Sequence, residues 1–519
     1  MTQIRLIVTV ALFFLLFDNY SFYENVLKVY PLNETGIFHL VSVALLLFTF
    51  TIFLFTLFSS KYTTKPLLIM TLLVSSFTTY FMSSYHVVID STMIRNTLQT
   101  DMHESLDLLS VKLFLYILFL GLLPSIWVYR KNIEYLSLKV ELFRKVKTLF
   151  LTLLVMVLLL LGSSKFFTSF FREHIPLRYH TNPTFWIYSI GEYIASTVQT
   201  ETIVVKSMGL NATIPPSTDT TPNLVIMVVG EASRADHFSL NGYEKETNPL
   251  LKKEHIINLP NVSSCGTSTA HSVPCMFSFF DRDDFNYKKG ISYENVLDVI
   301  HHTKKVEILW RDNNSDSKGV ALRVPYADYK QPSINSYCPE GECRDKGMLI
   351  GLQEYINKKE GKNILIVLHQ MGNHGPSYYK RYTKEFEKFT PVCKTNQLEE
   401  CTQESISNAY DNAILYSDYF LSEVIQLLKE NENNHKTSMI YMSDHGESLG
   451  EHGLYLHGLP YFMAPEAQTH IGAFMWFGKS NQRDFNSQKA YSHDNLVHTL
   501  LGLFNVKTKL YKEELDILR

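Results

Sequence analysis

The sequence predicts an α-helical membrane domain of five transmembrane helices, followed by an α/β domain whose mostly parallel sheet carries helices on both faces. Three observations predict this fold class. Nearly all the long apolar segments lie in the first third of the 519 residues. In the remainder, short apolar runs alternate with longer amphipathic stretches, as in parallel sheets covered on both faces. All six cysteines lie in that remainder, and the net charge of −3 is close to zero.

Five segments are long and apolar enough to span a bilayer, which takes about 20 residues of helix. They are centred on Ile4–Phe22, Ile37–Ser59, Pro66–His86, Leu108–Tyr129 and Thr148–Phe166. Asp18 and Asn19 interrupt the first segment near its end, and a cleaved signal peptide is the alternative for it. No small-residue cleavage pattern follows, so we expect a retained helix.

Basic residues indicate the orientation of the five segments. The short loops on one side contain Arg5, Lys61, Lys65 and the six basic residues between 130 and 147. Because basic loops stay cytoplasmic, the opposite loops, Glu24–Gly36 and Val87–Asp107, are expected outside. Everything after Phe166, including all six cysteines, then also lies outside.

The cysteines form three close pairs in the sequence: Cys265 and Cys275, Cys338 and Cys343, and Cys393 and Cys401. Close pairing is typical of local disulfides in an oxidising compartment. Zinc-binding pairs are the alternative, but no pair has the two-residue gap of C-x-x-C. We favour disulfides, which agree independently with the predicted orientation.

The predicted domains are 1–166 (transmembrane), 167–221 (bridging) and 222–519 (outer, globular). The bridging stretch "FFREHIPLRYHTNPTFWIYSIGEYIA" mixes aromatic residues with Arg and His, as expected of a segment at the headgroup level. A plain linker helix is the alternative. "NATIPPSTDTTPN" is a Pro/Thr/Ser-rich linker into the globular domain.

Polar residues follow four apolar runs of the globular domain. The runs are "NLVIMVVG" (223–230), "VEILW" (306–310), "NILIVLH" (363–369) and "SMIYM" (438–442). Glu231 follows the first, Lys318 the second, His374 the third, and Asp444 with His445 the fourth. Each alone is typical of a turn or a cap. Ligands gather at the carboxyl ends of parallel strands, so the four together predict a site.

Three hydroxyl residues, 267–269, precede a probable helix in "SSCGTSTAHSVPCMFS". A hydroxyl there is usually an N-cap, but a helix N-terminus also favours negative charge on a phosphate or alkoxide. A threonine hydroxyl needs a metal or a base to react. Zinc beside Glu231, Asp444 and His445 would activate it, and mixed carboxylate and imidazole ligands suit zinc better than manganese.

Five strings resemble one known family: "VVGEASRADHFSLNGYEKETNP", "SSCGTSTAHSVPCMFS", "LWRDNNSDSKGV", "LHQMGNHGPSYYKRY" and "SDHGESLGEHGLYLHG". The sequence is similar to the lipid A phosphoethanolamine transferases, which include the mobile colistin-resistance enzymes of Gram-negative bacteria. The resemblance covers essentially the whole chain. It implies a multi-pass inner-membrane protein whose periplasmic catalytic domain is of the alkaline-phosphatase/sulfatase type.

The resemblance also implies the roles of the site residues. Thr269 would be the nucleophile that carries phosphoethanolamine. The implied ligands of one zinc ion are Glu231, Thr269, Asp444 and His445. The residues implied around the phosphate or a second zinc are Lys318, His374 and His457. Glu447, Glu451 and His452 are expected to cap, to support the site or to lie in solvent. The implied disulfides are Cys265–Cys275, Cys338–Cys343 and Cys393–Cys401.

A membrane-domain loop, "NTLQTDMHE", matches a family loop that reaches the donor headgroup through Asn96, Thr100 and Glu104. Their four-residue spacing would place them on one helical face. The polar face of a loop helix is the alternative. His271 and His452 depart from the family pattern, and we expect both to be exposed bystanders.

The implied reaction transfers phosphoethanolamine from phosphatidylethanolamine to a phosphate of lipid A, which reduces surface negative charge and polymyxin binding. The alternatives are transfer to a lipopolysaccharide core sugar or another periplasmic glycan, phosphoglycerol transfer, or an inactive membrane-anchored binding protein. Sulfatase activity is not expected, because no C/S-x-P-x-R context surrounds Thr269. We expect a monomer with no nucleic-acid partner.

Overall fold

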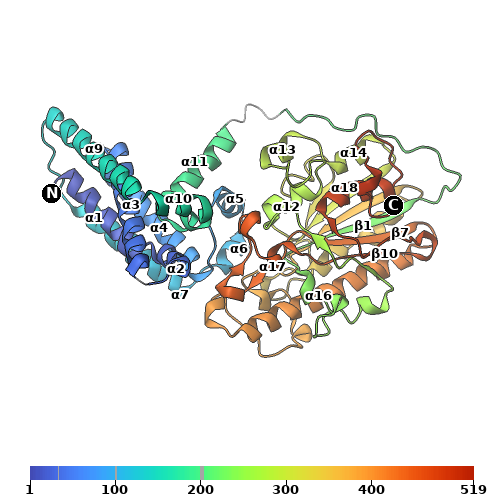
Figure 1. Cartoon of the computed structure of the whole chain (residues 1–519). Helices are drawn as coiled ribbons and strands as arrows, with labels where there is room; N and C mark the ends of the chain where they lie inside the picture. Colours follow the sequence, from blue (N-terminus) through green and yellow to red (C-terminus); the bar gives the residue numbers. More distant parts are fainter. Residues whose placement is uncertain (33, 100–101, 199–203) are drawn as a thin grey trace. The chain divides into compact units, whose positions relative to one another are not determined.

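The computed structural model describes residues 1–32, 34–99, 102–198 and 204–519 (Figure 1). The chain divides into two compact units. The membrane unit comprises Met1–Ile94 and Leu109–Thr197, and the α/β unit comprises Arg95–Leu108 and Val198–Arg519. The predicted boundaries at 166 and 221 stay a prediction.

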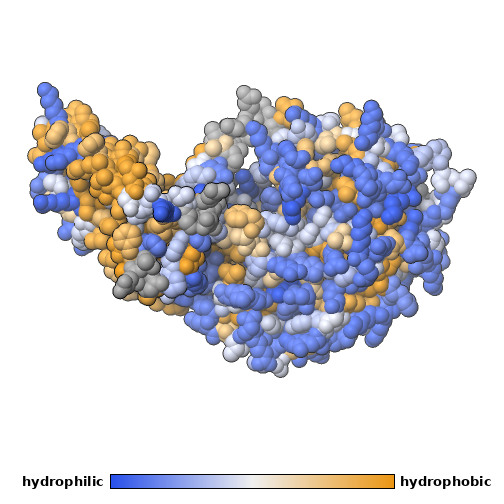
Figure 2. All heavy atoms as spheres, in the orientation of Figure 1, coloured by the Kyte–Doolittle hydropathy of each residue, from blue (hydrophilic) through white to orange (hydrophobic). Residues whose placement is uncertain are grey.

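The membrane unit contains four helical runs that are long and apolar enough to cross a bilayer, within the described residues. They are α3 (Glu34–Phe58), α4 (Thr64–Ser84), the run from α7 (Val111–Tyr116) through a π-helical segment into α8 (Leu123–Arg130), and α9 (Leu138–Gly162). A bent pair of helices provides a fifth crossing if it counts as one span. Figure 2 shows hydrophobic residues over the surface of these helices, whereas the surface of the α/β unit is mainly hydrophilic.

The first predicted span is bent rather than continuous. It consists of α1 (Gln3–Phe17) and α2 (Tyr20–Val29), which meet at an angle of 55°. Between them, the Asn19 amide donates hydrogen bonds to the carbonyls of Phe14, at 2.9 Å, and Asn182, at 2.6 Å. The helix breaks there because this buried side chain binds a segment far away in the sequence.

Part of the predicted basic loop after the fourth span is helical, because α9 begins at Leu138. Lys145 therefore projects from a helix, and its ammonium donates to the carbonyls of Leu57 and Ser59, both at 2.9 Å. These carbonyls lie at the carboxyl end of α3, where a cation is favourable. Beyond α9, the chain continues through α10 (Ser164–Glu173), a 3-10 turn at Ile175–His180 and α11 (Thr184–Val198).

The α/β unit is built on a seven-stranded sheet in the order β2-β10-β7-β1-β6-β4-β5. The strands are β1 (Asn223–Gly230), β2 (Ile257–Asn258), β4 (Val306–Asp312), β5 (Tyr326–Asp328), β6 (Asn363–His369), β7 (Lys436–Ser443) and β10 (Ala473–Phe477). Strands β7, β1, β6, β4 and β5 run parallel, whereas β10 is antiparallel to β7 and β2 is antiparallel to β10. The predicted mostly parallel sheet is confirmed.

Helices cover both faces of this sheet, as Figure 1 shows. One face packs against α12 (Thr269–Met276), α14 (Val296–His302) and α18 (Leu496–Leu503), and the other packs against α16 (Gln403–Glu430). Successive side chains of β1 alternate between the two cores, because strand side chains have a period of two. Both faces are buried, so the strands read as continuous apolar runs.

The three cysteine pairs form the predicted disulfides, Cys265–Cys275, Cys338–Cys343 and Cys393–Cys401. All three lie in the α/β unit. The first closes the loop that leads into α12.

Candidate metal centre and active site

The carboxyl ends of the central strands lie at one edge of the sheet. In the hydrogen-bonded register, Val229 of β1 aligns with His369 of β6, and Gly230 aligns with Ser443 of β7. Glu231 and the Asp444–His445 pair therefore leave neighbouring strands side by side. These are two of the four strand ends that the sequence predicts to meet at one edge.

Glu231, Asp444 and His445 form a buried cluster in which one ligand atom of each lies within 4.8 Å of the others. His445 Nε2 is 3.4 Å from Glu231 Oε1 and 3.4 Å from Asp444 Oδ2. The other ring nitrogen, Nδ1, lies 2.8 Å from the Gly446 carbonyl, to which it donates. That hydrogen bond leaves Nε2 as the ligand atom, an arrangement usual for metal-binding histidines.

The carboxylates of this cluster fit a divalent cation. Glu231 Oε1 and Asp444 Oδ2 are buried and have no hydrogen-bond partner within the described parts of the chain. Their other oxygens are occupied: Glu231 Oε2 accepts from Asn314 Nδ2 at 2.8 Å, and Asp444 Oδ1 accepts from the Ala232 amide at 3.1 Å. Buried carboxylate oxygens without partners are costly, and a cation between them and His445 would remove that cost.

The charges of the cluster reinforce this conclusion. Burial, together with the adjacent Glu231 charge, raises the pKa of Asp444 to about 7. Burial opposes ionisation of Glu231 too, but the close approach and the charge of His445 outweigh it and hold the pKa of Glu231 below its ordinary value. Burial likewise disfavours the His445 cation, yet Asp444 and Glu231 raise its pKa to about 10. The two carboxylates therefore favour a positive charge beside them.

Thr269 lies against this cluster as the first residue of α12. Its hydroxyl donates to Glu231 Oε2 at 3.1 Å, and Oγ1 is 3.3 Å from His445 Nε2. A single histidine fixes the preceding loop to the end of β7. His493 accepts from the Cys265 amide at 2.9 Å through Nδ1 and donates to the Ser443 carbonyl at 2.8 Å through Nε2.

His457 and His374 lie beside the cluster. The His457 ring is 4.2 Å from the His445 ring and 5.9 Å from the His374 ring, between centroids. Glu447 Oε2 lies 2.7 Å from His457 Nδ1, and its Oε1 accepts from the Tyr378 hydroxyl at 2.7 Å. His445, Glu447 and His457 form a second group with metal-ligand spacing. Burial, together with the nearby His445 charge, lowers the pKa of His457.

Lys318 also lies in the loop after β4, as predicted, and its side chain is buried. Its ammonium is 3.8 Å from Asp316 Oδ1. Within the described chain, no hydrogen bond or ion pair joins it to Glu231, Asp444 or His445. Its role at the phosphate stays a prediction.

Comparisons with known proteins match this architecture. A family model described as "Phosphoethanolamine transferase EptA/EptB" matches residues 47–198, and a sulfatase model matches residues 223–506. Phosphatidylethanolamine transferase Mcr-2 of Escherichia coli is 43% identical over 516 residues, which are 97% of this chain and 95% of the relative. The chain belongs to the phosphoethanolamine transferase family.

Two further relatives of this transferase agree. Phosphoethanolamine transferase EptA of Escherichia coli K12 is 37% identical, over 96% of this chain and 94% of the relative. The structure of the integral membrane protein lipooligosaccharide phosphoethanolamine transferase A from Neisseria meningitidis matches with a TM-score of 0.94 and 34% identity, over 99% and 98% of the two chains. The transferase is thus a multi-pass membrane protein with a periplasmic α/β domain of the sulfatase type.

The sequence reasoning missed two polar residues that hold the site of the transferase together. Asn314 donates to Glu231 Oε2 at 2.8 Å and to the Gln370 carbonyl at 2.8 Å, which links the ends of three strands. Asp345 accepts from the backbone amides of Met371, at 2.8 Å, and Gly372, at 3.1 Å, just before His374. Asn314 lies after an apolar run and could have been found from the strand pattern, whereas no local signal marks Asp345.

The predicted donor loop is described in part. Asn96 lies on α5 (Ser91–Gln99), Thr100 lies outside the described residues, and Glu104 lies on α6 (Met102–Asp107) with its side chain outside the description. The three residues stay predictions as headgroup contacts. The same segment is anchored in the α/β unit by the last residue of α6, Asp107, through an ion pair of 2.9 Å with Arg381 Nη2. Arg381 Nε in turn donates to the His374 carbonyl at 2.8 Å.

The two histidines that the sequence analysis singled out as bystanders, His271 and His452, differ in exposure. His452 is exposed, as expected. The expectation was wrong for His271, which is partly buried and contacts the edge of the Phe285 ring at 5.2 Å between centroids. Burial, and secondarily the charge of Arg95, lowers the pKa of His271 to about 4, so the ring packs as a neutral aromatic group.

Proposed function

We propose that the transferase moves phosphoethanolamine from phosphatidylethanolamine to a phosphate group of lipid A through a covalent phosphoethanolamine–Thr269 intermediate. The observation that carries this proposal is the position of Thr269 Oγ1, 3.1 Å from Glu231 Oε2 and 3.3 Å from His445 Nε2 at the N-terminus of α12. A helix N-terminus favours the negative charge of a phosphoryl group. The names of the Mcr-2 and EptA relatives support the donor and the transferred group.

In the first half-reaction, Thr269 Oγ1 attacks the phosphorus of the donor. A bond forms between phosphorus and Oγ1, and the bond between phosphorus and the glycerol oxygen breaks. Glu231 Oε2 orients the hydroxyl by accepting its hydrogen bond. The threonine proton ends on the glycerol oxygen, so diacylglycerol leaves as a neutral alcohol. His457, with Nδ1 bound to Glu447, and His374 are the candidate groups to deliver that proton.

In the second half-reaction, an oxygen of a lipid A phosphate attacks the phosphorus of the intermediate. A phosphorus–oxygen bond forms to the acceptor, the bond to Thr269 Oγ1 breaks, and the acceptor proton returns to the threonine. The product has a diphosphate linkage and an added ammonium group. The added positive charge reduces the net negative charge of the outer surface and weakens binding of cationic polymyxins.

The residues that would hold one zinc ion are Glu231, Asp444, His445 and Thr269. Bound zinc would lower the pKa of the threonine hydroxyl and stabilise the charge of the phosphoryl oxygens. The group of His445, Glu447 and His457, with His374 next to it, supports a second ion at the outer part of the same site. Lys318 is proposed to add positive charge for the phosphate, and Asn96, Thr100 and Glu104 to contact the donor headgroup.

Mass spectrometry of lipid A from cells expressing the transferase tests this proposal. We expect a phosphoethanolamine mass addition with the wild type, none with Thr269→Ala, and a reduced addition with Thr269→Ser, which keeps a hydroxyl. Persistent modification with Thr269→Ala would disprove the nucleophile assignment. If lipid A stayed unmodified while a core sugar gained the phosphoethanolamine mass, the proposed acceptor would be wrong. If the added mass were that of phosphoglycerol, the proposed donor would be wrong.

A further inference from the structure

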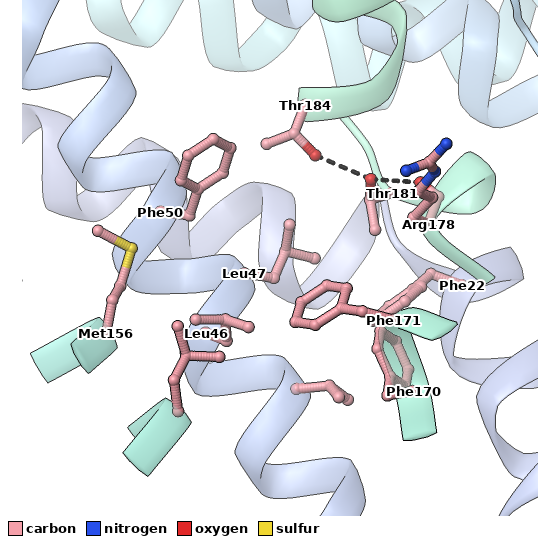
Figure 3. Close-up of a pocket in the computed structure, with 12 residues that line it drawn as sticks. Phe22, Leu46, Leu47, Phe50, Met156, Phe170, Phe171, Arg178, Thr181 and Thr184 are labelled. Atoms are coloured by element: carbon pink, nitrogen blue, oxygen red, sulfur yellow. Dashed lines mark hydrogen bonds between the residues drawn. The ribbon is translucent and has the colours of Figure 1, made fainter. Parts of the chain in front are cut away.

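The membrane unit contains a cavity of about 340 Å³ that the proposed transfer does not use. It lies among α2, α3, α9 and α10, and every lining residue belongs to the membrane unit. Figure 3 shows Phe50 and Met156 at one end and Phe22 and Arg178 at the other. Its volume is within the range of about 300–1,000 Å³ that is usual for small-molecule sites.

The walls of the cavity are almost entirely apolar. Leu47 of α3 and Phe171 of α10 face its centre, and Phe22, Phe50 and Met156 extend the apolar surface (Figure 3). Phe170 of α10 packs in one core cluster with residues of α2 and α3. Such walls suit a hydrocarbon chain, because no wall group requires a hydrogen-bond partner from the ligand.

The polar end of the cavity consists of Arg178, Thr181 and Thr184. The Thr184 hydroxyl donates to Thr181 Oγ1 at 2.8 Å, and the Thr181 hydroxyl donates to the Arg178 carbonyl at 2.7 Å (Figure 3). These bonds fix the backbone that carries Arg178. The guanidinium is exposed, and no Asp or Glu of the described chain forms an ion pair with it.

The location and charge of this end indicate the class of the ligand. Arg178 follows α9 and α10 and precedes the periplasmic unit, so it lies on the outer side of the membrane-spanning helices. Arginine binds phosphate in a bidentate manner and is a usual group for phosphate recognition. Among the side chains that the structure describes, none that lines the cavity is a carboxylate, so the ammonium of a zwitterionic headgroup would find no opposite charge among them.

We propose that this cavity binds one acyl chain of an anionic glycerophospholipid, whose phosphate contacts the Arg178 guanidinium. The lipid is a bound component of the membrane unit and differs in headgroup charge from the proposed donor. Leu47 and Phe171 contact its chain.

Photo-cross-linking of the full chain in nanodiscs tests this site. The probe is phosphatidylglycerol with a photoreactive group on one acyl chain, and cross-linked peptides are identified by mass spectrometry. We expect cross-links in residues 43–50 and 156–160, and unlabelled phosphatidylglycerol should compete at least fivefold better than phosphatidylethanolamine. Cross-links confined to other helices, or equal competition by the two lipids, would overturn the proposal.

Matched variants distinguish specific lipid binding in the cavity from general contact of the helices with the bilayer. Arg178→Gln removes the phosphate contact and should reduce cross-linking at least fivefold. Leu47→Trp fills the cavity and should reduce it similarly, with a thermal unfolding curve to confirm folding. Arg130→Gln changes an exposed arginine outside the cavity and should leave cross-linking within twofold of the wild type. Unchanged cross-linking in both Arg178→Gln and Leu47→Trp would reject the site, whether or not lipid A is modified.

Discussion

Buried polar side chains occur in both units of the transferase, but their hydrogen bonding differs. In the membrane unit, Asn182 Nδ2 donates to Thr79 at 2.7 Å and to the Ser75 carbonyl at 3.2 Å, and Oδ1 accepts from Trp186 at 3.0 Å. In the α/β unit, Glu231 and Asp444 each keep one buried oxygen without a hydrogen-bond partner in the described chain.

This difference separates a structural role from a binding role. A buried polar network whose members are all paired fixes the positions of the segments it joins. A buried carboxylate with a free oxygen destabilises the fold until a ligand binds it. Asn182 therefore stabilises the packing of the membrane helices, whereas Glu231 and Asp444 have the free oxygens of the proposed cation site, at the expense of the metal-free fold. Asp18 is intermediate, because Oδ1 accepts from Thr79 at 3.0 Å while Oδ2 has no partner among the described residues.

The largest expected effect is that of Glu231→Gln. The amide keeps the size of the side chain but removes one anionic ligand, so we expect loss of bound metal and a decrease in transfer of about 10³-fold or more. In chelator, the same variant should unfold at the wild-type temperature or above it, because one of two adjacent buried carboxylates is neutral. Metal analysis, a transfer assay and thermal unfolding check these outcomes, and full metal content in the variant would contradict them.

The opposite pattern is expected for Asn182→Ala in the membrane unit. Three side-chain hydrogen bonds disappear. Each is worth about 1 kcal/mol, so the free energy of unfolding should fall by about 3 kcal/mol. Metal content per folded molecule should not change. Denaturant unfolding in detergent measures the loss, and Asn132→Ala, at an exposed position of the same unit, is the control with no expected change. A loss of metal in Asn182→Ala would contradict the assignment of a purely structural role to the paired polar groups of the membrane unit.

Local sequence patterns predicted the fold and the central residues of the site. They did not predict the hydrogen bonds between distant segments that keep these parts in position. Glu231, Asp444 and His445 could be predicted because parallel strands place their carboxyl ends at one edge. Asp18 and Asn19 marked the interruption of the first span in the sequence, but the bonding partner of Asn19 could not be predicted, because Asn182 is 163 residues away. For the same reason Asp345 gave no signal, because its role depends on two backbone amides of a distant loop.

His493 extends the comparison to a titratable group whose two ring nitrogens are both hydrogen-bonded. Burial lowers the pKa of His493 to about 4, whereas the unfolded chain titrates near 6.5. Unfolding therefore takes up a proton between these values, so this stabilisation is complete above pH 6.5 and decreases as the pH falls toward 4. The expected loss from pH 6.5 to pH 5 is about 2 kcal/mol.

Unfolding free energies measured across this pH range, for the wild type and His493→Gln, check the contribution. The slope with pH should be smaller in the variant by about one proton per molecule. His301→Gln, at an exposed position of α14, should keep the wild-type slope. Equal slopes for the wild type and His493→Gln would show that this histidine does not titrate on unfolding.

The smallest effect is expected at Asp107, a buried carboxylate that has partners for both oxygens. Oδ1 pairs with the Lys380 ammonium and Oδ2 pairs with Arg381 at 2.9 Å. Asp107→Asn weakens both ion pairs, but Glu342 still contacts Arg381 at 3.3 Å, so part of the network remains. Amide hydrogen exchange in residues 102–108 should become about tenfold faster, which corresponds to about 1.4 kcal/mol of local stability.

Asp107→Asn is a direct test of whether partners decide the effect of a buried carboxylate. Asp107 and Glu231 have the same charge and are both buried, but of the two only Asp107 has hydrogen-bond partners for both oxygens among the described residues. Neutralising Glu231 should relieve the metal-free fold, whereas neutralising Asp107 should loosen α6 and leave metal content unchanged. Glu342→Gln is the matched control: it removes a carboxylate from the same network but not from the loop, so exchange in residues 102–108 should stay near that of the wild type. Slower amide exchange in residues 102–108 of Asp107→Asn would contradict this prediction. It would mean that burying a carboxylate destabilises this protein even when both oxygens have partners.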